Sequence, residues 1–271
     1  MTTERPSQGG GSGPSGGRRG DSIRFAFEEI KPLAPTPSFD ALCAEFGIAL
    51  EAPEVESLGL LLAMVIEGNR HLNLTAITDD EGMWNKHAFD SLTPLAVLSE
   101  LPEGSDVIDV GSGAGFPGLP LAIVCPHLRF TMLEATAKKC AFMHAAAERL
   151  GLLNVRVVQA RAESAGQDRS DTGHRERYQG VLARAVGRTP TLAELTVPLC
   201  AKGGVIVLIK GEKADEELAE AQHALRELRA VHEMTIPTPT GRLVVLRKGA
   251  LTPKIYPRRD GEPKSRPLMG R

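Results

Sequence analysis

The residues best suited to chemistry form a glycine-rich stretch, residues 109–118 (DVGSGAGFPG), which follows a short apolar segment expected to be a strand. Glycine has no Cβ, so this backbone can bend sharply and let a ligand lie against its amides. Glu134 ends the next expected strand, nineteen residues after Gly115. A carboxylate at that position can accept both hydroxyl protons of an adenosine ribose. These residues therefore predict a nucleoside-binding site.

The loop alone is compatible with two classes of cofactor. Gly113, Gly115 and Gly118 satisfy the spacing of the dinucleotide fingerprint of dehydrogenases. A dinucleotide also needs a second mononucleotide-binding half, whereas this chain ends after one expected sheet. Asp109 would repel a pyrophosphate but suits a cationic amino acid group. These features favour S-adenosylmethionine over NAD, and Glu134 argues against the alternative that the loop is merely a tight turn.

Ahead of the glycine loop the sequence predicts a tail and a helical cap. Residues 1–37 are rich in Gly, Ser and Pro and are expected to be disordered, because they hold too little apolar surface to offset the entropy of ordering. Residues 38–100 are expected to form a small cap of three helices. The first begins near Ser38, and the others cover 54–70 and 83–98.

Residues 101–248 alternate short apolar strands with helices, which is typical of a doubly wound α/β sheet. Ligands of such sheets bind beyond the carboxyl ends of the strands. A turn at 238–241 joins the last two strands as a hairpin, so one of them is antiparallel. We expect the seven-stranded sheet of class I methyltransferases. The expected strands cover 107–110, 129–133, 155–158, 180–183, 205–209, 231–236 and 242–247, and the helices 137–150, 191–201 and 212–230.

Composition argues against several classes of protein. With 42% hydrophobic and 24% charged residues over 271 positions, the chain can bury one sizeable core. It has no apolar run long enough for a membrane span and no apolar signal at its N-terminus, so we expect a cytoplasmic protein without a membrane partner. The four cysteines are widely spaced, which indicates reduced thiols and no disulfide framework or metal site.

Charge is unevenly distributed. The formal net charge is −2, which argues against a protein that coats nucleic acid indiscriminately. The C-terminal tail, residues 249–271, is basic: from Lys248 to the end, seven Lys and Arg residues face two acids. Such asymmetry favours an anionic partner, and a solvated tail without a partner is an equal alternative.

Beyond these patterns, the residues resemble the glucose-inhibited division protein B family over about residues 38–265. Its members are guanine-N7 methyltransferases of 16S rRNA. The most specific match is Phe116-Pro117-Gly118 after the glycine loop, combined with Asn73-Leu74-Thr75 and Asp90-Ser91-Leu92. The other matching stretches are Lys86-His87, residues 109–115, Leu133-Glu134-Ala135, Lys138-Lys139, Arg161-Ala162-Glu163, Leu182-Ala183-Arg184-Ala185, Lys210-Gly211 and residues 252–258.

The resemblance implies S-adenosylmethionine as cofactor and 16S rRNA, within the small ribosomal subunit, as partner of a monomeric enzyme. The chain departs from the family pattern in its long N-terminus and in an insertion at 167–177, which we expect to be a surface loop. With the acid and glycines of the loop, the expected cofactor-binding residues are Asp109, Gly111, Gly113, Gly115, Phe116, Glu134, Ala135, Thr136, Ala162, Glu163 and Arg184.

The remaining residues bear on the methyl acceptor. Methylation of an exocyclic amine commonly uses an Asn/Asp-Pro-Pro-aromatic motif, and methylation of pyrimidine C5 needs a cysteine. The chain has no Pro-Pro pair and no cysteine near the loop ends, whereas guanine N7 presents a lone pair without a proton and needs no general base. Arg184, Asn73 and His87 are the candidates for shaping the acceptor site. Arg184 should not cover N7 with a guanine fork, because the fork would occupy the attacking lone pair.

Six basic residues are candidates for RNA contact: Lys210, Lys254, Arg258, Arg259, Lys264 and Arg266. Each of them could instead be a solvated side chain. Two alternatives to an rRNA methyltransferase stay open from the residues themselves. The first is a methyltransferase of a small molecule or protein, and the second is a nucleotide-binding regulator without catalysis.

Overall fold

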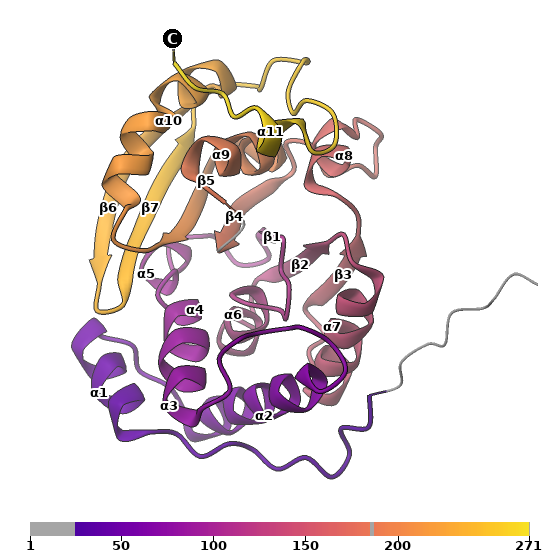
Figure 1. Ribbon diagram of the computed structural model, residues 1–271, viewed down its shortest axis with the longest axis vertical. Coiled ribbons are helices and arrows are strands. Elements are labelled where there is room, and N and C mark those ends of the chain that lie inside the picture. Colours follow the sequence, from indigo (N-terminus) through magenta and orange to yellow (C-terminus); the bar gives the residue numbers. More distant parts are fainter. Residues whose placement is uncertain (1–24, 185–186, 271) are drawn as a thin grey trace, which may run out of the picture.

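The computed structural model describes residues 25–184 and 187–270, in which one seven-stranded sheet carries helices on both faces (Figure 1). The strand order is β3-β2-β1-β4-β5-β7-β6, with β1 to β5 parallel and β7 antiparallel to both of its neighbours. This is the expected doubly wound sheet with its terminal hairpin. The strands are β1 (Asp106–Val110), β2 (Arg129–Glu134), β3 (Val155–Gln159), β4 (Tyr178–Arg184), β5 (Cys200–Lys210), β6 (Ala230–Thr238) and β7 (Gly241–Lys248). Residues 1–24 of the expected disordered tail, Ala185 of the family motif and Arg271 lie outside the described residues. The rest of that tail, residues 25–37, is ordered, because Phe27 is buried against Phe142.

Alternate side chains of the strands fill two cores, one on each face of the sheet. In β1, Val107 belongs to one core and Ile108 to the other, as the two-residue period of a strand requires. The core of Ile108 is covered by α9 (Thr189–Thr196) and α10 (Ala214–Leu228). The sheet is therefore buried on both faces, which is typical of parallel strands.

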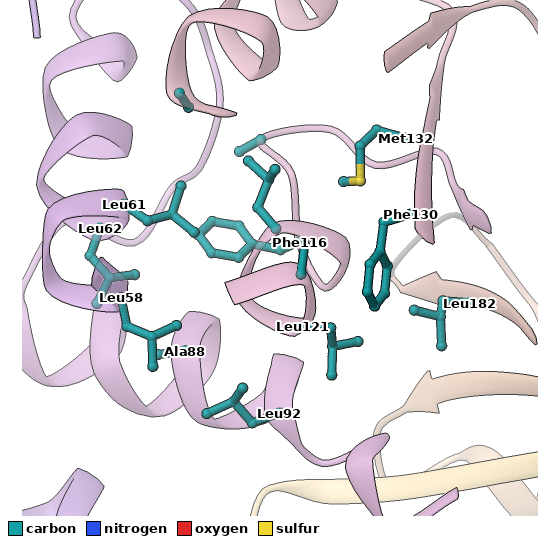
Figure 2. Close-up of a cluster of buried hydrophobic side chains, with 14 of the residues drawn as sticks. Leu58, Leu61, Leu62, Ala88, Leu92, Phe116, Leu121, Phe130, Met132 and Leu182 are labelled. Atoms are coloured by element: carbon teal, nitrogen blue, oxygen red, sulfur yellow. The ribbon is translucent and has the colours of Figure 1, made fainter. Parts of the chain in front are cut away.

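The cap helices share the core on the other face. There α6 (Gly118–Val124) and α7 (Ala137–Arg149) pack against the sheet, and α2 (Ala52–Asn69) packs against these two helices. Figure 2 shows Leu61 of α2 in one cluster with Leu182 of β4. No helix of the described residues, including the 18-residue α2, is long and apolar enough to cross a membrane.

The first cap helix, α1 (Pro37–Phe46), begins just before the expected cap, Ser38. The residue that caps it is Thr36, whose hydroxyl accepts a hydrogen bond from the Phe39 backbone N–H at 3.3 Å. The helix ends at Gly47, which adopts a left-handed conformation with φ of 73°. Hydroxyl residues stand at both 36 and 38, so residue type alone did not locate the cap.

The expectation of one helix over 83–98 is wrong. The Asp90 N–H donates to the carbonyl of Asn85, five residues back, and the surrounding turns are of the wider π type. A π-turn adds a residue to the helical turn and is frequent at functional sites. Apolar spacing does not separate it from an α-helix. The segment consists of α3 (Asp80–Gly82), η1 (Met83–Phe89), α4 (Asp90–Leu92) and α5 (Leu95–Leu98).

Element boundaries in the second half also differ from expectation. The helix expected over 191–201 ends at Thr196 and continues as a 3₁₀ turn, η2 (Val197–Leu199). β5 starts at Cys200, five residues before its expected start, because its first part pairs with Tyr178 across an irregularity in the ladder. Two short helices complete the fold, α8 (Ala162–Gln167) and α11 (Glu262–Ser265).

The insertion at 167–177 is only partly the surface loop that was expected. Arg175 points inward, and its side chain is 6% exposed. Its guanidinium donates to the carbonyl oxygens of Gly166, Tyr256 and Thr252, each at 2.7 Å. An arginine can be buried at modest cost when its donors have acceptors, so a polar sequence did not dictate exposure here. The insertion fastens the C-terminal segment to the body of the protein.

Candidate active site

A cavity of about 550 Å³ opens at the carboxyl ends of β1, β2 and β4, the edge where doubly wound sheets bind ligands. His87 from η1 lines it against Phe116 of the loop that follows β1, and Lys264 from α11 lines it from the C-terminal segment. The predicted cofactor-binding residues that line the cavity are Gly111, Gly113, Phe116, Glu134, Ala135, Ala162, Glu163 and Arg184. The predicted residues Asp109, Gly115 and Thr136 are not part of this lining.

Backbone conformation and close contacts explain why glycine occupies these positions of the loop. Gly111, Gly113 and Gly115 have φ of 73°, 59° and 93°, a region that favours glycine. At Gly115 a Cβ would also lie 2.4 Å from the Leu119 side chain. Gly113 faces open space, since a Cβ there would meet only the Gly111 carbonyl, at 3.8 Å. The loop thus keeps bare backbone beside the cavity.

Glu134 at the end of β2 joins the loop to the second strand. Its carboxylate accepts the Gly113 N–H at 3.1 Å and the Thr136 N–H at 2.8 Å. The side chain is buried, with 8% exposure, and lines the cavity. Each carboxylate oxygen accepts more than one hydrogen bond, so Glu134 retains capacity for the hydroxyls of a ribose.

Asp109 braces the loop from beneath. One carboxylate oxygen accepts the Gly118 N–H at 3.1 Å, whereas the other is buried without a hydrogen-bond partner among the described residues. Burial raises the pKa of Asp109 to about 7. A buried acceptor without a donor is costly, and its chain neighbours Val110 and Gly111 line the cavity. The unsatisfied oxygen lies beneath the loop and not in the cavity lining, so the carboxylate that fits the ribose of S-adenosylmethionine is Glu134, which lines the cavity.

Arg184 and His87 form one packed unit with Phe116 at the other end of the cavity. The His87 ring stacks on Phe116 with centroids 4.7 Å apart, and the Arg184 guanidinium lies 5.2 Å from the centroid of the same ring. Arg184 donates to the Lys86 carbonyl at 2.8 Å and lies 3.2 Å from Nδ1 of His87. His87 Nε2 is 2.7 Å from the Thr75 hydroxyl. Two of the three candidates for shaping the acceptor site therefore lie in contact.

The electrostatics of this unit define the state of His87. Burial, followed by the charge of Arg184, lowers the pKa of His87 to about 4. The guanidinium can only donate, so Nδ1 of the neutral ring is the acceptor and Nε2–H donates to Thr75. His87 consequently holds Arg184 in place, and its ring has no unoccupied lone pair.

The third candidate, Asn73, is exposed, and its neighbour Leu74 lines the cavity. The turn that presents them is tied by a different residue, Asn69. Its amide oxygen accepts the N–H groups of Leu74 and Thr75 at 2.8 and 3.1 Å, and its NH₂ donates to the Thr75 carbonyl at 2.9 Å. Asn69 is a positioning residue that sequence reasoning missed, although it opens the polar turn in the chain.

Two of the six basic candidates for RNA contact are held in internal ion pairs. Lys210 lies 2.6 Å from Glu217, and its side chain is 9% exposed. Arg258 lies 2.6 Å from Glu194, a carboxylate that is fully buried. The other four basic candidates, Lys254, Arg259, Lys264 and Arg266, are exposed, and Arg266 also lies 3.8 Å from the Glu262 carboxylate.

The cavity also includes residues that were not predicted to contact the cofactor. Arg161 lines it although it was noted only as part of a family motif, and Leu195 of α9 gave no sequence signal. Lys139, in the first turn of α7, lines the wall near Ala135. Among the described residues, no three His, Cys, Asp or Glu side chains are grouped as a metal site would need.

Comparison with known proteins agrees with the geometry of this site. The family model GidB, described as rRNA small subunit methyltransferase G, matches residues 54–242. Ribosomal RNA small subunit methyltransferase G of Sorangium cellulosum is 45% identical over 228 residues, which cover 84% of this chain and 94% of that protein. Proteins of the same name are 40% identical in Lactobacillus johnsonii (83% of this chain, 96% of that one) and 41% identical in Trichormus variabilis (77% and 88%). The chain therefore belongs to the rRNA small subunit methyltransferase G family, enzymes that methylate 16S rRNA with S-adenosylmethionine.

Proposed function

We propose that the protein transfers the methyl group of S-adenosylmethionine to N7 of a guanine in 16S rRNA. The proposal is supported by the residues that line the cavity. One end offers a ribose acceptor, Glu134, beside bare loop backbone, and the other end offers Arg184 on a neutral histidine. The cofactor supplies the reactive methyl group and its own leaving group. The chain's residues then have to bind, orient and exclude water.

The state of His87 supports a ring nitrogen as acceptor. His87 is the one histidine among the described residues that line the cavity. Its pKa is about 4 and its Nδ1 lone pair already accepts a hydrogen bond from Arg184, so the ring is unsuited to remove a proton at neutral pH. Guanine N7 carries no proton to remove. An exocyclic amine would have to lose one during the reaction, so it is the less suitable acceptor here.

The arrangement of Arg184 is compatible with a guanine substrate. Two of its five N–H donors are committed to Lys86 and His87, which fixes the plane of the guanidinium. The remaining donors can hold guanine O6, a phosphate or the cofactor carboxylate while N7 stays uncovered.

The form of the substrate follows from RNA geometry. In an A-form duplex, N7 lies in a deep, narrow groove that side chains cannot enter. We therefore expect the target guanine in a loop or as a splayed base, within the small subunit. The enzyme is expected to act as a monomer in the cytoplasm.

The proposal is tested by identifying the methylated nucleoside. Small subunits from cells that lack the enzyme would be incubated with labelled S-adenosylmethionine and the protein, and the 16S rRNA digested to nucleosides. We expect the label in 7-methylguanosine, and a greatly reduced yield with Glu134→Ala. Label in N2-methylguanosine or in a methylated pyrimidine would overturn the proposal.

A further inference from the structure

The basic C-terminal segment, residues 249–270, is not a free tail. It runs back across α8 and α9 on one side of the sheet (Figure 1). Its firmest attachment is Arg258, whose guanidinium pairs with the buried carboxylate of Glu194 at 2.6 Å and whose backbone N–H donates to the same carboxylate at 2.8 Å. A carboxylate without solvent exposure needs such partners, so this attachment fixes the path of the segment.

A second set of contacts joins the segment to the rim of the cavity. Glu163 accepts the Gly261 N–H at 2.8 Å, and the Thr191 hydroxyl donates to the Pro263 carbonyl at 3.2 Å. Both Glu163 and Thr191 line the cavity, as does Lys264, the residue after Pro263. The short helix α11 therefore contributes Lys264 to the wall of the cavity, and it is tied to the rim through Gly261 and Pro263, which precede Lys264.

Lys264 is the residue of this wall with hydrogen-bond donors available to a ligand. The side chain is exposed, and among the described residues no carboxylate lies within 4.0 Å of its ammonium group. The Glu163 carboxylate is already occupied by the segment itself. Lys264 thus contributes three available donors to the side of the cavity formed by Ala162 and Glu163. This side adjoins Glu134, because the Ala160 N–H donates to the Glu134 carbonyl at 3.1 Å and Ala160 and Ala162 both line the cavity. A base attached to a ribose at Glu134 would be a neighbour of this side, and a purine offers ring nitrogens that accept hydrogen bonds.

We propose that α11 forms part of the purine-side wall of the cofactor pocket through Lys264, and that Lys264 contacts the cofactor directly. The inference rests on the proposed cofactor site. The C-terminal segment then has two partners: Lys264 contacts the cofactor, and Lys254, Arg259 and Arg266 remain exposed to contact RNA. The cofactor site and the RNA-facing surface are then parts of one continuous segment.

The test is calorimetric titration with S-adenosylhomocysteine in the absence of RNA. Lys264→Met keeps the length of the side chain and removes its charge, and Lys254→Met makes the same change in the same segment away from the cavity. We expect affinity to fall about tenfold for Lys264→Met, as loss of a hydrogen bond from a charged group implies, and to be unchanged for Lys254→Met. Lys264→Arg, which keeps the charge, should recover most of the affinity.

The outcomes separate this inference from the proposed function. Unchanged affinity in Lys264→Met, with weaker binding in Glu134→Ala, would overturn the role of Lys264 and leave the cofactor site intact. Failure of the wild-type protein to bind S-adenosylhomocysteine would instead overturn the proposed site itself. Thermal melting of each variant, expected to match the wild type because Lys264 and Lys254 are exposed, shows that a loss of affinity is not a loss of fold.

Discussion

At the scale of single residues, the site depends on side chains that each hold a neighbour as well as face the cavity. Glu134 ties two backbone amides, and His87 bonds Arg184 and Thr75. Such residues are fixed before any ligand arrives, which reduces the cost of binding. Changes at these positions should therefore affect ligand affinity and loop order together.

Replacing Glu134 with Ala should weaken binding of S-adenosylmethionine by about ten- to a hundredfold. The change removes charge-assisted hydrogen bonds worth on the order of 1.5–3 kcal/mol each and also frees the Gly113 amide. Titration calorimetry measures the affinity. Glu103→Ala, an exposed acid outside the cavity, is the control and should bind normally. Equal affinity in Glu134→Ala and the control would contradict the assignment.

His87 predicts a distinctive pH dependence. Its folded pKa of about 4 lies below the unfolded value of 6.5, so the unfolded chain binds more protons between these values. The contribution of neutral His87 to stability is complete above pH 6.5 and is lost as pH falls toward 4. Denaturant unfolding of wild type and His87→Asn should diverge by on the order of 1–3 kcal/mol over that window. Parallel pH curves for the two proteins would show that His87 is not held neutral.

Sequence reasoning found the strand-end residues of the site and missed those brought by chain folding. Glu134, Phe116 and Arg184 follow strands whose carboxyl ends meet at one edge, so their proximity could be predicted. Lys264 reaches the same cavity through α11, whose path depends on Arg258 finding a buried acid 64 residues away. Residue type and local spacing carry no information on such a long-range pair.

At the scale of elements, the sheet was predictable and the irregular segments were not. Alternating strands and helices and a terminal turn specify the doubly wound order, and the observed sheet has it. The π-helix η1 (Met83–Phe89) was expected as part of an ordinary helix, since its buried side chains have near-helical spacing. The insertion was expected at the surface because it is polar and charged. The sequence does not reveal the acceptors that let Arg175 be buried, since they come from distant parts of the chain.

The attachment of the C-terminal segment yields a prediction about stability. Arg258→Met should lower the free energy of unfolding by about 3–5 kcal/mol, because it leaves the Glu194 carboxylate buried without its charged partner. Adding Glu194→Gln should restore most of the loss, since an amide is cheaper to bury and still accepts the Arg258 backbone N–H. Urea unfolding of the two variants decides the matter. If the double variant is no more stable than the single one, the ion pair does not anchor the segment.

At the scale of the whole molecule, positive charge is presented on two different edges of the sheet. Lys264 of the C-terminal segment lines the cavity, whereas Lys254 and Arg259 of the same segment line a separate hollow. Arg129, Arg156 and Arg177 line another hollow, which also includes residues at the amino ends of β1 to β4. The formal net charge of −2 thus hides an uneven distribution, in which basic side chains gather at separate places on the surface.

This distribution predicts which cations set the salt dependence of RNA binding. Replacing Lys254, Arg259 and Arg266 with Gln should flatten the plot of log affinity against log salt by about 0.7–0.9 per lost phosphate contact. The matched control replaces Arg129, Arg156 and Arg177 with Gln and should leave the slope unchanged. Binding to 16S rRNA over a range of salt concentrations gives both slopes. Equal slopes for the two triple variants would mean that the C-terminal segment does not face RNA.

The central claim, methylation of a single guanine at N7, is tested most directly by chemical cleavage of the product. N7-methylated guanine is cationic and its ring is weakened, so borohydride followed by aniline cuts the RNA at that nucleotide. Small subunits from cells that lack the enzyme would be treated with the protein, S-adenosylmethionine and these reagents. The account predicts new cleavage at one guanine of 16S rRNA. Incorporation of methyl groups without aniline-sensitive cleavage would contradict it, because another atom would then be the acceptor.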